Sequence, residues 1–188
     1  MKKLLNRTLI TVAAIALTGC NAVIVESYPS IPAGYNEGDF EQATSRGAIT
    51  TIVVGNPFSN QSADFADRVR AFMKDQVGTA PVTFVSSPGP STTAPFKIVV
   101  VFNARDDVSN STICEVGDTA PTTGGGTGQV SVTMVFCEGS RPRSGTRGRI
   151  SGVQGLNDSK FISLVQQVAN LMIPPPGLQR QLEKDNAL

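Results

Sequence analysis

The sequence predicts an α+β fold: a two-layer sandwich with a mixed, mostly antiparallel sheet of four to five strands and two helices on one face. Three observations lead to this prediction. A strand, an amphipathic helix and a second strand follow in that order, which gives a parallel pair with a right-handed crossover. Three apolar segments then follow without a helix between them, which favours an antiparallel meander. A second amphipathic helix comes last.

The first strand-helix-strand unit is expected from residue 49 onward. Residues 49–54 are β-branched and predict a strand. Apolar residues then recur at helical spacing, with Ser62 as a candidate N-cap and Gly78 as a candidate stop. The apolar face of this helix consists of Phe65, Val69, Phe72, Met73 and Val77. A short strand over 82–86 and a Pro-, Ser- and Thr-rich loop over 87–95 complete the unit.

The meander and the last helix follow from their hydrophobic patterns. Residues 96–102 are almost continuously apolar, which predicts a central strand. Residues 129–137 alternate apolar and polar side chains, as in a strand with one buried face, and 147–153 form a weaker strand. A helix is expected over 159–173, capped by Asn157 or Asp158 and stopped by three prolines at 174–176.

The beginning of the chain has the features of a secretory signal. Lys2, Lys3 and Arg7 form a basic region, and an apolar run of about nine residues follows, which is too short to span a bilayer. Four predicted regions result: a signal peptide over 1–19, a tether over 20–46, a single α+β domain over 47–176 and a polar tail over 177–188.

Leu17-Thr18-Gly19-Cys20 resembles the lipobox of bacterial lipoproteins. The resemblance implies cleavage before Cys20, diacylglycerol on its thiol and a further acyl chain, such as palmitate, on its amino group. Asn21, where an aspartate would favour the inner membrane, implies sorting to the periplasmic face of the outer membrane. The alternative is an ordinary signal peptide that has a cysteine near its end by chance.

A second resemblance lies in residues 51–58, Thr-Ile-Val-Val-Gly-Asn-Pro-Phe. This segment is similar to the opening strand and loop of the TolB amino-domain and curli-transport lipoprotein type. The similarity implies a small cell-envelope α/β domain, and it assigns no functional residue.

Charge and cysteine content limit the function classes. The chain has formal charge +1, and residues 1–19 contribute three basic and no acidic residues, so the mature chain would carry −2. This balance argues against nucleic-acid binding. With Cys20 acylated, Cys114 and Cys137 remain, and in an oxidising periplasm they are expected to form a structural disulfide. A redox pair is the alternative, but the two cysteines lack Cys-x-x-Cys spacing.

Candidate catalytic chemistry is sparse. The sequence contains no histidine, which excludes Ser-His-Asp and Cys-His systems and histidine-based zinc sites. We expect no enzyme activity, no cofactor and no metal. Acidic residues around the first cysteine of the pair could offer oxygen ligands to calcium, but a solvated loop is the simpler interpretation; they are Asp106, Asp107, Glu115 and Asp118.

The one concentrated charge feature is a group of four arginines within nine residues: Arg141, Arg143, Arg147 and Arg149. We expect them on a turn between two strands. Guanidinium groups suit phosphate and carboxylate, so an anionic lipid head group, glycan or protein is a candidate partner. The alternative is a solvated hairpin. In either case the sequence predicts that replacing all four by glutamine changes stability little.

These observations favour an outer-membrane-anchored periplasmic lipoprotein that acts as a non-enzymatic accessory or assembly component of a cell-envelope system. Its expected partners are membrane lipid, through the Cys20 anchor, and an envelope protein or anionic head groups. The alternative is a periplasmic binding module for an anionic lipid or glycan.

Overall fold

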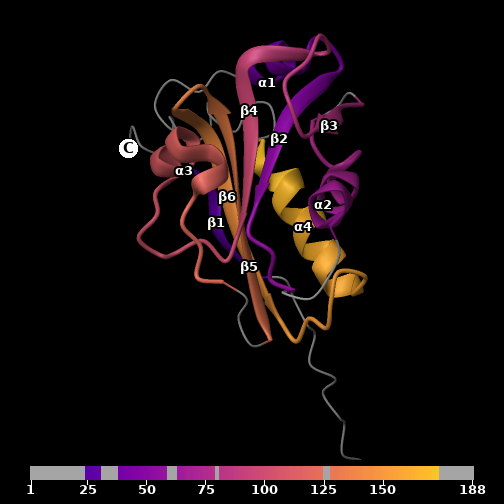
Figure 1. Cartoon of the computed structure of the whole chain (residues 1–188), viewed down its shortest axis with the longest axis vertical. Helices are drawn as coiled ribbons and strands as arrows, with labels where there is room; N and C mark the ends of the chain where they lie inside the picture. The colour runs from indigo at the N-terminus through magenta and orange to yellow at the C-terminus, as the bar shows by residue number, and fades with distance from the viewer. Residues whose placement is uncertain (1–23, 31–37, 59–62, 79–80, 125–127, 174–188) are drawn as a thin grey trace, which may run out of the picture.

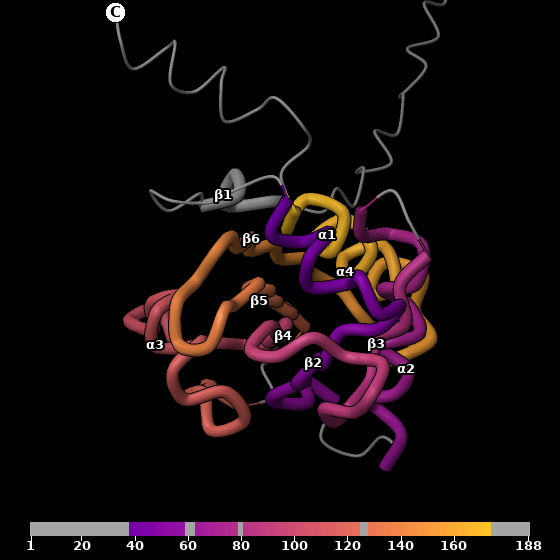
Figure 2. The backbone as a smooth tube through the Cα atoms, turned by 90° about the horizontal axis from the view of Figure 1, so that it is seen from above, coloured from indigo at the N-terminus to yellow at the C-terminus, as the bar shows by residue number. Residues whose placement is uncertain are grey.

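A computed structural model of the full chain describes residues 24–30, 38–58, 63–78, 81–124 and 128–173, with 24–30 described by their backbone alone. Within these residues, six strands form one mixed sheet in the order β1-β6-β5-β4-β2-β3. Helices α1, α2 and α4 lie on one side of the sheet, and helix α3 lies on the other (Figures 1 and 2). The α+β class predicted from the sequence is confirmed.

The element bounds are as follows. The strands are β1 (Ile24–Ser30), β2 (Ala48–Val54), β3 (Thr83–Val85), β4 (Thr92–Phe102), β5 (Gln129–Glu138) and β6 (Arg141–Ser151). The helices are α1 (Gly38–Thr44), α2 (Phe65–Met73), α3 (Asn110–Val116) and α4 (Ser159–Met172), with a short 3₁₀ turn, η1 (Gly117–Thr119), after α3.

The strand directions agree with the expected topology. Strand β2 pairs in parallel with β3, as the strand-helix-strand order predicts. It also pairs in parallel with β4, a pairing that the sequence analysis did not assign. Strands β4, β5 and β6 form the antiparallel meander, and β1 pairs antiparallel with β6 at the edge. Strand β4 is central, and its residues 98–102 are all buried, in agreement with their continuous apolar run.

The main core lies between the sheet and α1, α2 and α4. Phenylalanine rings fill its middle: Phe161 of α4 stacks on Phe102 of β4 with centroids 5.5 Å apart, and Phe65 of α2 meets Phe102 edge to face at 5.2 Å. Six α4 residues are buried, namely Phe161, Leu164, Val165, Val168, Ala169 and Met172. Removing each of these side chains other than the small Ala169 from water stabilises the fold by roughly 1.5–3 kcal/mol before entropy is subtracted.

A smaller core lies on the opposite face of the sheet. Ile113 and Cys114 of α3 pack there against Val99 and Val101 of β4 and Val135 of β5. The sequence predicted helices on one face of the sheet only. This prediction is wrong, because α3 covers part of the other face. Helix α3 is short and buries only these two side chains, which is too few to form a periodic pattern.

Three predicted elements have different bounds. Helix α2 ends at Met73, one turn before the expected stop, because Lys74 is extended and Asp75 has a positive φ of 61°. Val77 is nevertheless buried. Its apolar side chain therefore fits the helical pattern in the sequence although it lies beyond the end of the helix, which is why the predicted helix was too long. Strand β4 begins at Thr92, inside the segment expected as a loop, and β6 begins at Arg141 rather than 147. The candidate N-cap Ser62 lies outside the described residues.

Two parts of the segment expected as a tether pack on the domain. Strand β1 pairs with β6 from Ile24 opposite Arg149 to Ser30 opposite Gly145. Helix α1 buries Phe40, whose ring meets Phe136 of β5 edge to face at 5.5 Å. The folded part therefore begins before residue 47. The signal peptide, Cys20 and the tail from 177 lie outside the described residues.

Candidate functional site

The four arginines lie in a strand rather than in a turn. The β5–β6 turn consists of Gly139 and Ser140, and β6 begins at Arg141. The expectation of an arginine-bearing turn is corrected accordingly. The pairing of β6 with β5 holds this segment extended along its whole length, from Glu138 opposite Arg141 to Gln129 opposite Ser151.

A β-bulge divides the arginines between two sides of the sheet. The β5–β6 register shifts between Phe136, opposite Ser144, and Cys137, opposite Pro142. Such an extra residue changes the face to which later side chains point. Arg143 consequently pairs with Asp39 of α1, whereas Arg147 contacts the loop after β4. The four guanidinium groups therefore do not form one basic cluster.

Arg143 links helix α1 to the β5–β6 hairpin. Its Nη2 lies 2.9 Å from Oε2 of Glu138, and its Nε lies 3.4 Å from Oδ2 of Asp39. The side chains of Arg143 and Asp39 are only 23% and 11% exposed. A charge in this position needs a partner because burial removes its hydration. Arg143 thus acts as a structural ion-pair residue between two elements.

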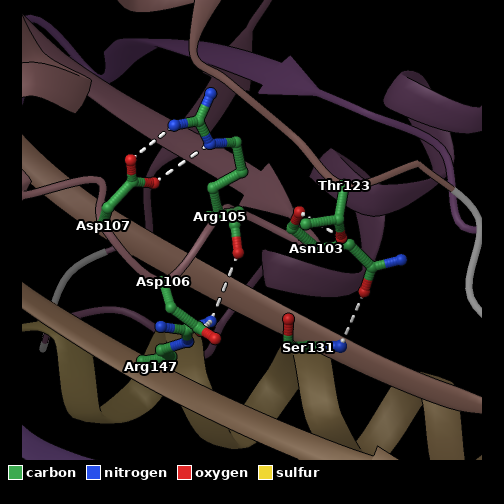
Figure 3. A network of polar contacts seen from close by, with 8 residues as sticks. Asn103, Arg105, Asp106, Asp107, Thr123, Ser131 and Arg147 are labelled. Atoms are coloured by element: carbon green, nitrogen blue, oxygen red, sulfur yellow. Dashed lines mark hydrogen bonds and ion pairs between the residues drawn. The ribbon is translucent and has the colours of Figure 1, made fainter.

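Arg147 holds the loop that follows β4. Its guanidinium donates to the Ala104 carbonyl at 3.3 Å and to the Asp106 carboxylate at 2.9 Å (Figure 3). The Asp106 side chain is 95% exposed, so this ion pair is screened by solvent and weak. The hydrogen bond to the buried segment at Ala104 is the more important contact.

Asn103 directly follows β4 and stabilises the start of the loop that Arg147 also contacts. Its φ of 49° is in the left-handed region, which asparagine tolerates better than most residues. The side chain donates to the Gly124 carbonyl at 2.9 Å. It accepts from the Ser131 N–H at 3.0 Å (Figure 3). The Thr123 hydroxyl donates to the Asn103 carbonyl at 3.1 Å. Sequence reasoning missed this residue because its partners are 20 or more positions away.

The acidic residues expected as calcium candidates do not gather into a cation site. Asp106 pairs with Arg147, and Asp107 accepts hydrogen bonds from Arg105 (Figure 3). The hydrogen bond from Arg105 holds the pKa of Asp107 below its usual value. The described part of the chain contains no group of three or more His, Cys, Asp or Glu residues that could hold a metal ion.

The predicted disulfide between Cys114 and Cys137 is present, with the Cα atoms 5.7 Å apart. It joins α3 to β5, and both cysteines are fully buried. The bridge therefore fastens the small second core to the sheet.

A surface hollow lies beside α4, where the sequence had suggested no site. It has a volume of about 340 Å³ and is lined by Gln76, Ser163, Gln166, Gln167, Asn170 and Leu171. We call it the amide groove. Its lining contains four carboxamide side chains and no charged side chain. A second hollow of about 280 Å³ is formed by 154–158 at the N-terminus of α4.

The predicted lipid attachment site, Cys20, lies outside the described residues, but its distance along the chain from the domain is short. Strand β1 begins at Ile24. Among the described helices, none is both long and apolar enough to cross a bilayer.

Comparisons with known proteins give two results. No protein-family model and no curated protein matches the chain. Among solved structures, the fold resembles two dodecamers of PelC from Paraburkholderia phytofirmans, one of them a single-substitution variant. Their TM-scores are 0.43 and 0.42, with 17% identity over 82% of this chain and 98% of the PelC chain. This likeness is too low to carry function or assembly across, so the function is argued from the chain's own residues.

Proposed function

We propose that this protein is an outer-membrane-anchored lipoprotein that faces the periplasm and acts as a non-enzymatic accessory or assembly component of a cell-envelope system. The observation that carries the proposal is the lipobox-like Leu17–Cys20 segment, which is followed within a few residues by a strand of the folded domain.

The position of β1 supports a close attachment. Cys20 and Ile24 are four residues apart, so an extended chain between them spans at most about 14 Å. Strand β1 starts beside the end of β6, where Ile24 lies opposite Arg149. An acyl anchor on Cys20 would therefore hold this end of the sheet near the bilayer. Helix α1 and the β5–β6 turn lie at the opposite end (Figure 1) and would face the periplasm.

The chemistry of the described residues supports a non-enzymatic role. The chain has no histidine, and Cys114 and Cys137 are buried in a disulfide. The arginines that sequence analysis singled out include two, Arg143 and Arg147, that contact carboxylates of their own chain. None of these groups is arranged as a nucleophile with a base beside it.

The second candidate function is a module that binds an anionic ligand. One observation favours a narrower version of it, in which a single arginine makes the contact. Arg149 is exposed and lies opposite Ile24, at the end of the sheet that the anchor would bring to the bilayer. Its guanidinium would be within reach of lipid phosphates there, and such contacts are strong. In this candidate function, one arginine that faces the membrane binds the anion, whereas the sequence had predicted a turn with four anion-binding arginines.

The orientation can be tested with the acylated chain in liposomes that contain spin-labelled head groups. A fluorescent amino acid is placed either at Gln129, at the start of β5, or at Ser140, in the opposite turn. The proposal predicts stronger quenching at position 129 than at position 140. Equal quenching, or stronger quenching at 140, contradicts it. Cys20→Ser, which should abolish retention on the liposomes, is the control for the anchor.

A further inference from the structure

The amide groove is a hollow lined by polar but uncharged side chains and one leucine. Ser163, the adjacent pair Gln166 and Gln167, and Asn170 follow one another at spacings of three to four residues, so they lie along one side of α4. Gln76 closes the groove from the region after α2. The lining thus offers carboxamide donors and acceptors from two separate segments.

The early end of α2 explains how Gln76 reaches the groove. After Met73 the chain turns through Asp75, which has a φ of 61°, and the Gln76 N–H donates to the Met73 carbonyl at 3.1 Å. If the helix had continued, as its hydrophobic pattern suggested, Gln76 would lie on its surface at the next turn. Val77 is buried directly after it and fixes this conformation. The position of Gln76 is therefore determined by the fold.

Leu171 supplies the apolar element of the groove. Its side chain is 38% exposed, and it is the only large hydrophobic residue in the described part of the chain that is exposed. Most small-ligand sites have volumes from about 300 Å³ upward and a predominantly apolar lining. The groove, at about 340 Å³, lies at the lower end of that range. It has one apolar residue among six, so its lining suits a polar ligand.

We propose that the amide groove binds a short segment of an uncharged glycan, with sugar hydroxyl or acetamido groups hydrogen-bonded to Gln76, Gln166, Gln167 and Asn170. Each carboxamide both donates and accepts, as a sugar hydroxyl does, so the two groups are complementary. Leu171 would contact the apolar C–H face of a sugar ring.

The lining argues against other ligand classes. It contains no arginine or lysine, which an anionic ligand would require, and no carboxylate for a cation. It has no aromatic residue or arginine, the side chains that dominate the energetics of protein–protein contacts. A lipid tail would leave the four carboxamides buried without partners, which is costly. An uncharged polyhydroxyl ligand satisfies them.

The test is a titration of the full chain with two neutral probes, tetra-N-acetylchitotetraose and maltotetraose, by calorimetry and by NMR of the side-chain amides. We expect binding of at least one probe, shifts of the Gln166 and Gln167 amide signals, and an affinity that is unchanged by added salt. The double variant Gln167→Ala/Asn170→Ala should weaken binding about tenfold or more, which corresponds to about 1.4 kcal/mol. Gln42→Ala, an exposed glutamine on α1, is the matched control and should bind as the wild type does.

Several results would overturn the proposal. Neither probe binds at millimolar concentration, or the double variant and the Gln42 control bind equally well. Loss of binding on adding salt would identify an electrostatic site elsewhere. A change of oligomeric state in the double variant, without a change in sugar affinity, would identify the groove as a contact between protein chains. None of these measurements depends on Cys20, so they succeed or fail independently of the proposed membrane anchor.

Discussion

Replacing Arg143 by glutamine should destabilise the protein far more than the same change at Arg141. Arg143 contacts Glu138 at 2.9 Å and Asp39 at 3.4 Å, and its side chain is 23% exposed. Arg141 is an exposed residue at the start of the same strand. The sequence alone predicted that all arginines of this segment could be exchanged with little loss, so the comparison tests what the structure adds.

The magnitude follows from the burial of the ion pair. Losing one partner of a fully buried pair costs roughly 3–5 kcal/mol, whereas exposed pairs contribute about 0–1 kcal/mol. Arg143 lies between these limits, and its second contact is long, so we expect a loss of about 2 kcal/mol. For a domain of this size, that loss lowers the melting temperature by about 4–8 °C. Arg141→Gln should change stability by less than about 0.5 kcal/mol.

The assay is urea unfolding of the full chain with the disulfide intact. The curves are analysed with one common m value, the slope of the free energy of unfolding against urea concentration. A double variant, Asp39→Asn/Arg143→Gln, completes a mutant cycle and should lose less than the sum of its single variants, because the two side chains share one interaction. If Arg143→Gln and Arg141→Gln unfold at the same urea concentration, or if the cycle is additive, the assigned role of Arg143 is refuted.

Three further predictions concern the disulfide, one helix cap and one buried asparagine. Reducing Cys114–Cys137, whose partners are 23 positions apart, should cost about 3 kcal/mol, and alkylation of native, unreduced protein should label neither cysteine; labelling without prior reduction would contradict the disulfide. Asp158 caps α4 by accepting from the Lys160 N–H at 2.9 Å, so Asp158→Ala should cost about 1 kcal/mol in chemical unfolding. Hydrogen bonds, first from the Gln154 N–H and then from the Lys160 N–H, lower the pKa of Asp158. Its ionised form therefore stabilises the fold above the unfolded pKa of about 3.9, and this stabilisation is lost as pH falls through the folded value. The advantage of wild type over Asp158→Asn should shrink below about pH 3.9, and a constant difference across this range would count against the cap. Asn103→Ala should cost about 2–3 kcal/mol, and more than Asn103→Gly, because glycine restores the positive φ though not the hydrogen bonds; equal losses in calorimetric unfolding would show that backbone conformation is not involved.

The parts of the fold that could be predicted are those with strong local patterns. Residues 98–102 of β4 and the apolar face of α4 are buried as their sequences indicate. The strand-helix-strand order then predicted the parallel pairing of β2 with β3, whereas the parallel pairing of β2 with β4 was not predicted. The disulfide followed from cysteine count and the expected compartment.

The elements that were missed depend on long-range contacts. Helix α3 has two buried residues, and the disulfide and packing against β6 hold it in place. Gly145 illustrates this, since a Cβ there would lie 2.6 Å from Nδ2 of Asn110 on α3. In the sequence, this glycine, with its arginine and serine neighbours, suggested a turn. Its missing side chain instead leaves room for the Asn110 side chain of α3 against the strand, a contact that no local pattern reveals.

The candidate site was missed for a related reason. The amide groove combines the polar residues of α4 with Gln76, which joins them because α2 ends a turn early. Polar residues on the outer face of a helix are ordinary in a sequence. They become a candidate site only when a second segment closes over them.

The central claim is that the chain is a lipid-anchored envelope protein, and the most direct test is the intact mass of the protein purified from membranes. The account predicts a chain that begins at Cys20, with the added mass of two or three acyl chains on its amino-terminal peptide, and with no such product from Cys20→Ser. A chain that keeps residues 1–19, or one that begins at or near Cys20 without acyl mass and is released from membranes by salt alone, would contradict it.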